Sequence, residues 1–122
     1  MTEHNHIVSV YGTLMAGYSN HSLLIGAVPL GKTRTVSKHT LVDWKAFPAL
    51  VLKGDTQISC EAYRVCDRTL KRLDALEGYP TFYDRTQVEL ENGLTSWIYF
   101  IPESDINVDE EDIVEDGSWG CL

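Results

Sequence analysis

The sequence lacks several features that would assign it to large classes of protein. No stretch approaches the roughly 18 consecutive apolar residues of a membrane-spanning helix. The first six residues contain no basic region followed by an apolar run, so no signal peptide is predicted. Cysteine is scarce: Cys60, Cys66 and Cys121 have no metal-ligand spacing, which predicts reduced thiols. We therefore expect a soluble cytoplasmic protein.

Basic residues are missing from one long segment. Residues 103–116 contain eight acidic side chains and no lysine or arginine, whereas the rest of the chain has ten acids and ten bases. Nucleic-acid surfaces need clustered lysine and arginine to displace counterions, so this charge distribution excludes that class of partner. The segment is predicted to be a solvated acidic stretch.

Metal-binding patterns are also missing. Asp105 and Asp109 have the opening spacing of a calcium-binding loop, but Glu110 stands where that loop requires glycine. His4 and His6 lie near the start of the chain, where two histidines rarely form a designed metal site. We therefore predict no metal and no organic cofactor.

The residues that are present predict a small β-rich α+β domain spanning residues 1–122. The length fits one domain, and 43% apolar residues suffice for a packed core. Periodicity and turn residues do not give the regular strand–helix alternation of a parallel doubly wound sheet. They predict, in order, a strand over 6–11, short strands and turns over 28–52, a strand over 58–65, a helix over 67–77, and strands over 82–90 and 95–101 joined by an Asn-Gly turn.

The predicted helix contains an acidic residue on its apolar face. Glu77 lies four residues after Leu73 and seven after Leu70, so the three share a face. Glu77 also lies in the last turn, where the helix dipole disfavours negative charge. Burial and the dipole both raise a carboxyl pKa, and such a group suits acid/base catalysis. The alternative is a glutamate at a fraying helix end that swings into water.

The second candidate site is the loop after the first strand. Gly12 directly follows the strand end, where a ligand can approach the backbone and successive N–H groups can bind a carboxylate. An ordinary strand-to-helix turn is the alternative reading, because Gly-Thr-Leu alone specifies nothing.

Taken together, these segments resemble the gamma-glutamylcyclotransferase-like family. The resembling blocks occur in the family's order and span nearly the whole chain: Tyr11-Gly12-Thr13-Leu14, Phe47-Pro48-Ala49-Leu50, Glu61–Val65, Leu70–Glu77, Gly78-Tyr79-Pro80, Tyr83-Asp84-Arg85 and Gly117-Ser118-Trp119. Within the family, Thr13 and Asn20-His21 are most similar to the gamma-glutamylamine cyclotransferase type.

The resemblance implies a β-barrel-like α+β fold with one or two flanking helices. It also implies that Glu77 is the catalytic carboxylate and that the backbone of Tyr11, Gly12, Thr13 and Leu14 binds the glutamyl end of a small substrate. Tyr83 is expected to line the same cavity. The implied reaction, of lyase or acyltransferase type, releases 5-oxoproline and a free amine from a gamma-glutamyl amine or amino acid. Its nucleophile is the substrate's own α-amine, so the enzyme need not supply one.

A non-catalytic member of the same fold is the alternative function. Such a protein would bind a small ligand or another protein in the same pocket, with the acidic segment as an interaction element. Glu77 favours the enzyme, because a pure binder has no reason to keep a costly carboxyl on an apolar face.

Overall fold

A computed structural model describes residues 6–12, 14–15, 21–44, 47–106, 112–115 and 117–119, with backbone alone for residues 44, 47 and 112. Its elements run along the chain as β1 (His6–Val10), the 3-10 helix η1 (His21–Leu24), β2 (Val28–Trp44), β3 (Phe47–Val65), α1 (Asp67–Glu77), β4 (Asp84–Glu89), β5 (Thr95–Phe100), the 3-10 helix η2 (Glu103–Asp105) and β6 (Asp112–Ile113).

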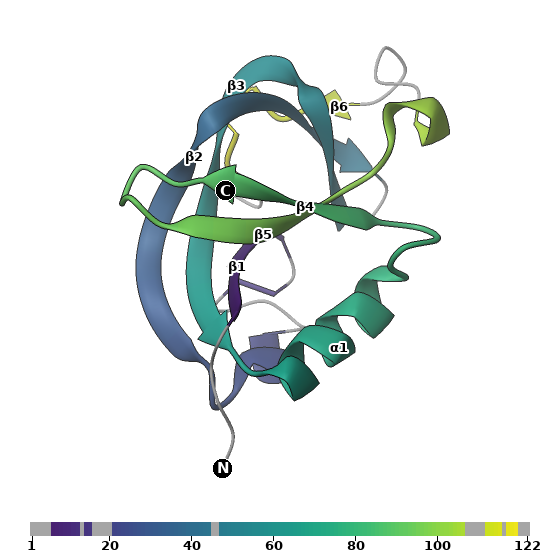
Figure 1. Cartoon of the computed structure of the whole chain (residues 1–122). Coiled ribbons are helices and arrows are strands. Elements are labelled where there is room, and N and C mark those ends of the chain that lie inside the picture. Colours follow the sequence, from purple (N-terminus) through teal and green to yellow (C-terminus); the bar gives the residue numbers. More distant parts are fainter. Residues whose placement is uncertain are drawn as a thin grey trace.

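The described strands form one mixed sheet in the order β4-β5-β1-β3-β2-β6. β1 pairs with β5 in parallel, and the other pairs are antiparallel. The described strands do not close into a complete barrel, although an isolated bridge between Thr35 and Leu90 links β2 to the end of β4. Figure 1 shows the resulting curved sheet, with α1 lying across from the long pair β2 and β3. The predicted barrel-like α+β fold is confirmed.

Strands β2 and β3 are much longer than the sequence predicted. The glycines and prolines of residues 28–52 suggested short strands, but the two strands have 17 and 19 residues. The pair contains register shifts, one of which lies between Pro29 and Gly31. At Gly54 the two strands come so close that an added Cβ would lie 2.3 Å from the carbonyl carbon of His39.

The sheet separates two apolar clusters. Val65 and Tyr63 of β3 face the cluster that also contains Leu70 and Leu73 of α1. Ile58 and other alternate residues of β3 face the second cluster, which Val114 and Trp119 near the C-terminus cover. This part of β3 is therefore covered by apolar residues on both faces.

Helix α1 begins and ends where periodicity predicted. Leu70 and Leu73 are buried, whereas Leu76 is 42% exposed. The N-cap is Cys66, and Asp67 is the first helical residue. Gly78 ends the helix in the left-handed conformation at φ 69°, which glycine adopts without steric cost.

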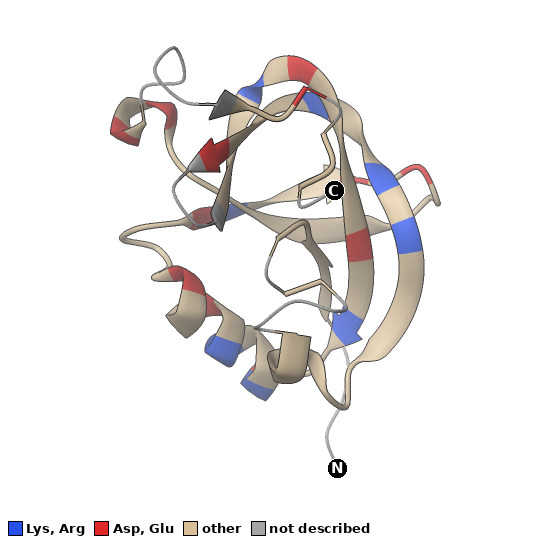
Figure 2. Cartoon of the chain, turned by 180° about the vertical axis from the view of Figure 1, so that it is seen from behind, with Lys and Arg blue, Asp and Glu red and all other residues tan. Residues whose placement is uncertain are grey.

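Charged side chains lie mainly on the outside of the fold. Figure 2 shows lysine and arginine on β2 and α1, and acidic residues on η2. Glu103, Asp105 and Glu115 of the acidic segment are exposed, as predicted, whereas residues 107–111 and 116 lie outside the described part. None of the described helices is long and apolar enough to cross a membrane.

Replacement of Gly54 by alanine should destabilise the sheet by about 1–3 kcal/mol, because the new methyl group would overlap the β2 backbone. Urea denaturation measures this change. The exposed neighbour gives the matched control Lys53→Ala, which should change stability by less than about 0.5 kcal/mol. An unchanged unfolding midpoint in Gly54→Ala would show that β2 and β3 separate easily here.

Candidate functional site

Glu77 lies at the C-terminal end of α1 and is partly buried. Burial raises the pKa of Glu77 to about 7. The local backbone fixes this helix end: Tyr79 N donates to the Asp74 carbonyl at 2.9 Å, and Tyr83 N donates to the Glu77 carbonyl at 3.1 Å. The turn that follows the helix therefore folds back on the residue that bears the carboxyl.

Tyr83 lies in this turn and reaches across to β3. Its side chain is 5% exposed, and its hydroxyl donates to the Pro48 carbonyl at 2.7 Å. Burial raises the pKa of Tyr83 well above its ordinary value, and the nearby Glu77 carboxyl adds to the effect. Tyr83 therefore lies within electrostatic range of Glu77.

The loop that follows β1, residues 11–14, is called the glycine loop here, and its Gly12 lies against Pro48. A Cβ added to Gly12 would lie 2.6 Å from Pro48 Cγ, so only glycine permits this approach. Met15 N donates to the Gly12 carbonyl at 2.9 Å, and His21 Nδ1 lies 2.9 Å from the Leu14 carbonyl. Pro48 is therefore the contact shared by the glycine loop and Tyr83.

Tyr11 places the start of this loop within the electrostatic range of Glu77. Its hydroxyl donates to the Tyr99 carbonyl at 2.7 Å, and its side chain is 6% exposed. Burial raises the pKa of Tyr11, with smaller contributions from Tyr83 and Glu77. Four predicted site residues, Tyr11, Gly12, Tyr83 and Glu77, therefore gather around one place. Leu14 is a buried core residue whose carbonyl faces His21. Thr13 lies outside the described residues.

A second group of residues in this region was not predicted. The carboxylate of Asp74 on α1 accepts hydrogen bonds from Tyr99 and Arg85. Its partners lie 25 and 11 residues away along the chain. The available sequence signal was its position three residues before Glu77, which puts both acids on neighbouring parts of the helix surface.

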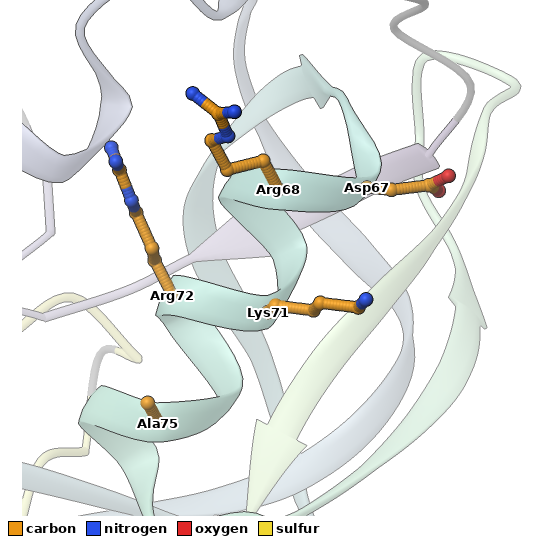
Figure 3. A pocket seen from close by; sticks show the side chains of 5 residues that line it. All are labelled: Asp67, Arg68, Lys71, Arg72 and Ala75. Carbon is orange, nitrogen blue, oxygen red and sulfur yellow. The ribbon is translucent and has the colours of Figure 1, made fainter.

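A separate hollow of about 510 Å³ lies on the outside of α1. It is lined by Asp67, Arg68, Lys71, Arg72 and Ala75. Figure 3 shows Arg68 and Arg72 extending to one side of the helix and Asp67 and Lys71 to the other. Its lining contains neither Glu77 nor a residue of the glycine loop, so this shallow basic surface is distinct from the candidate site.

Comparison with known proteins identifies the family. The family model described as "Gamma-glutamyl cyclotransferase, AIG2-like" matches residues 8–121. The chain belongs to this family. A Vibrio cholerae relative named "Putative gamma-glutamylcyclotransferase" is 41% identical over 99 residues, which cover 81% of this chain and 84% of the relative. The gamma-L-glutamyl-butirosin B gamma-glutamyl cyclotransferase of Niallia circulans is 30% identical over 105 residues, covering 79% and 67% of the two chains.

Solved structures support the same fold. An AIG2-like protein of Mus musculus has a TM-score of 0.73 and 27% identity, with 88% of this chain and 82% of that chain covered. An uncharacterized protein of Pyrococcus horikoshii has a TM-score of 0.78 at 23% identity, covering 94% and 90%. The resemblance to the gamma-glutamyl cyclotransferase family is thereby confirmed, and so is the family's fold.

The raised pKa of Glu77 predicts a pH-dependent effect of Glu77→Gln on stability. The folded state binds this proton more tightly than the unfolded state, whose glutamate keeps the ordinary value of 4.5. The contribution of Glu77 to the parent's free energy of unfolding therefore falls as the pH rises from about 4.5 to about 7. Glu77→Gln should be more stable than the parent above pH 7, by up to roughly 3 kcal/mol. The two should converge below about pH 4.5.

Chemical denaturation at several pH values tests this prediction, with Glu89→Gln on the exposed side of β4 as the matched substitution. Equal stability of parent and Glu77→Gln across the whole range would mean that the Glu77 carboxyl is fully solvated.

Proposed function

We propose that this protein is a gamma-glutamyl cyclotransferase that releases 5-oxoproline and a free amine from a gamma-glutamyl amine or a gamma-glutamyl amino acid. The observation that supports this function best is the partly buried carboxyl of Glu77, with a pKa near 7, in electrostatic range of Tyr11 at the start of the glycine loop. Membership of the family supports the same activity.

The reaction needs orientation and proton transfer rather than a protein nucleophile. The substrate's α-nitrogen attacks its own γ-carbonyl carbon, a five-membered lactam forms, and the bond to the leaving nitrogen breaks. The α-nitrogen loses two protons and the leaving nitrogen gains two, so the net charge is unchanged. One carboxyl that alternates between its ionised and neutral forms is suited to this transfer.

Glu77 is the proposed general acid/base. Its ionised form takes a proton from the α-ammonium, and its neutral form returns a proton to the departing amine. A carboxyl pKa of about 7 makes both forms available near neutral pH. The conjugate acid of the leaving amine is a weaker acid than this carboxyl, so the return of the proton is favourable.

The glycine loop is proposed to bind the glutamyl end of the substrate. Backbone N–H groups from Tyr11 to Leu14 would donate to the α-carboxylate and to the oxyanion that develops on the γ-carbonyl oxygen. Gly12 keeps the loop against Pro48, and Tyr83 holds the Pro48 carbonyl from the other side. Movement of this loop would therefore affect substrate binding first.

Glu77→Gln should lower 5-oxoproline release by at least about 100-fold, the lower end of what general acid/base catalysis contributes. Release should be measured on a panel of gamma-glutamyl amines and amino acids, with Glu89→Gln as the control. In the parent, kcat/KM should rise with pH and level off above about 7, because the base must be ionised. A folded Glu77→Gln variant with parental activity would refute the role of Glu77.

Gly12→Ala should raise KM more than it lowers kcat, because the added methyl group would push the loop away from Pro48. Steady-state kinetics of the purified variant measures both constants. The double variant Gly12→Ala/Pro48→Ala removes the overlapping ring carbon and should recover part of the lost affinity. If KM stays at the parental value in Gly12→Ala, the glycine loop does not bind the substrate.

A further inference from the structure

Asp74 connects the last turn of α1 to the sheet. Its carboxylate accepts a hydrogen bond from the Tyr99 hydroxyl at 2.6 Å and from Arg85 Nε at 3.0 Å. Arg85 Nη2 lies 3.4 Å from the second carboxylate oxygen. Asp74 is in the same helical turn as Glu77, so these bonds to β4 and β5 restrain the turn that carries the proposed acid/base.

Arg85 contacts the chain on both sides of Glu77. Besides binding Asp74, its guanidinium lies 4.5 Å from the ring centre of Tyr79 and 4.2 Å from that of Trp97. Tyr79 belongs to the turn after the helix, and Trp97 belongs to β5. A planar cation between two aromatic rings is well ordered, so Arg85 fixes the positions before and after Glu77 relative to the sheet.

Tyr99 extends these contacts to the glycine loop. Its hydroxyl binds Asp74, while its backbone carbonyl accepts the hydroxyl of Tyr11 at 2.7 Å. Tyr99 is 3% exposed and belongs to the apolar cluster beneath α1. A continuous series of contacts therefore runs from Arg85 through Asp74 and Tyr99 to Tyr11.

We propose that Asp74, Arg85 and Tyr99 are positioning residues that hold the Glu77 carboxyl at a fixed place relative to the glycine loop. Their importance for catalysis rests on the proposed function. Misplacement of a catalytic group by about 1 Å can lower a rate by 100-fold, so loosening these contacts should affect kcat more than KM.

The opposite charges of Asp74 and Arg85 allow the arrangement to be tested through the titration of Glu77. Among the described residues, Tyr11 after β1, Tyr83 in the turn and Tyr99 on β5 lie in electrostatic range of Glu77. Asp74 on α1 and Arg85 on β4 act on Tyr99 in turn. Burial raises the pKa of Glu77, and the ion pair of Arg85 Nε with Asp74 Oδ1 at 3.0 Å holds two opposite charges together at the same helical turn. Removal of either charge leaves the other uncompensated near the carboxyl.

The experiment is a titration of the Glu77 carboxyl by ¹³C NMR in Asp74→Asn, Arg85→Met and the double variant. Asp74→Asn leaves the guanidinium uncompensated and should lower the midpoint, whereas Arg85→Met leaves the carboxylate uncompensated and should raise it. Each shift should be about 0.5–1 pH unit, and the double variant should return towards the parent. If both single variants shift the midpoint down towards 4.5, or neither shifts it, the proposal is overturned.

Kinetics of conservative variants supply the second measurement. Arg85→Lys keeps the positive charge but loses the planar guanidinium that contacts Asp74 through two nitrogens and lies over the two aromatic rings. The pH midpoint of Glu77 should therefore stay parental in this variant, while kcat falls about 10-fold or more. Tyr99→Phe keeps the ring and should lower kcat with KM within about twofold. Tyr63→Phe is the matched control, because Tyr63 also donates to a buried carboxylate, that of Glu61 at 2.8 Å.

Tyr63→Phe should keep the parental kcat per folded molecule, with folding measured by thermal melting. Equal kcat losses in Tyr99→Phe and Tyr63→Phe would overturn the positioning role. The NMR titration needs no substrate, so it tests the positions and charges even if the chain releases no 5-oxoproline. Failure of the cyclotransferase activity and failure of this proposal are therefore separately recognisable.

Discussion

The site depends on keeping one carboxyl out of water at the end of a helix. Burial raises the pKa of Glu77, and α1 is held on the sheet by Leu70 and Leu73, which belong to the core cluster. The cost of burying a carboxyl is lower when the group can become neutral, which a pKa near 7 allows. Stability and chemistry are therefore linked at this residue: a better solvated Glu77 would cost less but would be a weaker base.

The site also requires the ends of distant segments to meet. The loop after β1, the start of β3, the turn after α1 and the strand β5 each contribute a contact near Glu77. The sheet order brings them together, because β1 lies between β5 and β3. Pro48 is the point at which close packing decides the geometry, since its ring occupies the space that any side chain at residue 12 would need.

Local sequence patterns predicted the helix and several strands, but neither the length of β2 and β3 nor the tertiary contacts. Helix α1 could be predicted with its ends, because the spacing of Leu70 and Leu73 and the cap at Gly78 are local signals. The inward position of Glu77 followed from the same periodicity. The length of β2 and β3 could not be predicted from the sequence, because their tolerance for glycine and proline comes from register shifts between the paired strands. The partners of Asp74 could not be predicted either, since the local sequence around a helix-surface aspartate is the same whether it faces water or an arginine from a strand.

The hydroxyls of Tyr11, Tyr83 and Tyr99 limit which protons can be exchanged in this region. Each donates its single hydrogen to a fixed protein acceptor: a backbone carbonyl for Tyr11 and Tyr83, and the Asp74 carboxylate for Tyr99. Burial raises the pKa of all three, so they keep these hydrogens at neutral pH. Their oxygens retain lone pairs but have no further hydrogen to donate. Among these four described groups, the proton that can be exchanged near pH 7 is therefore that of Glu77, and the three phenols can serve a substrate as hydrogen-bond acceptors alone.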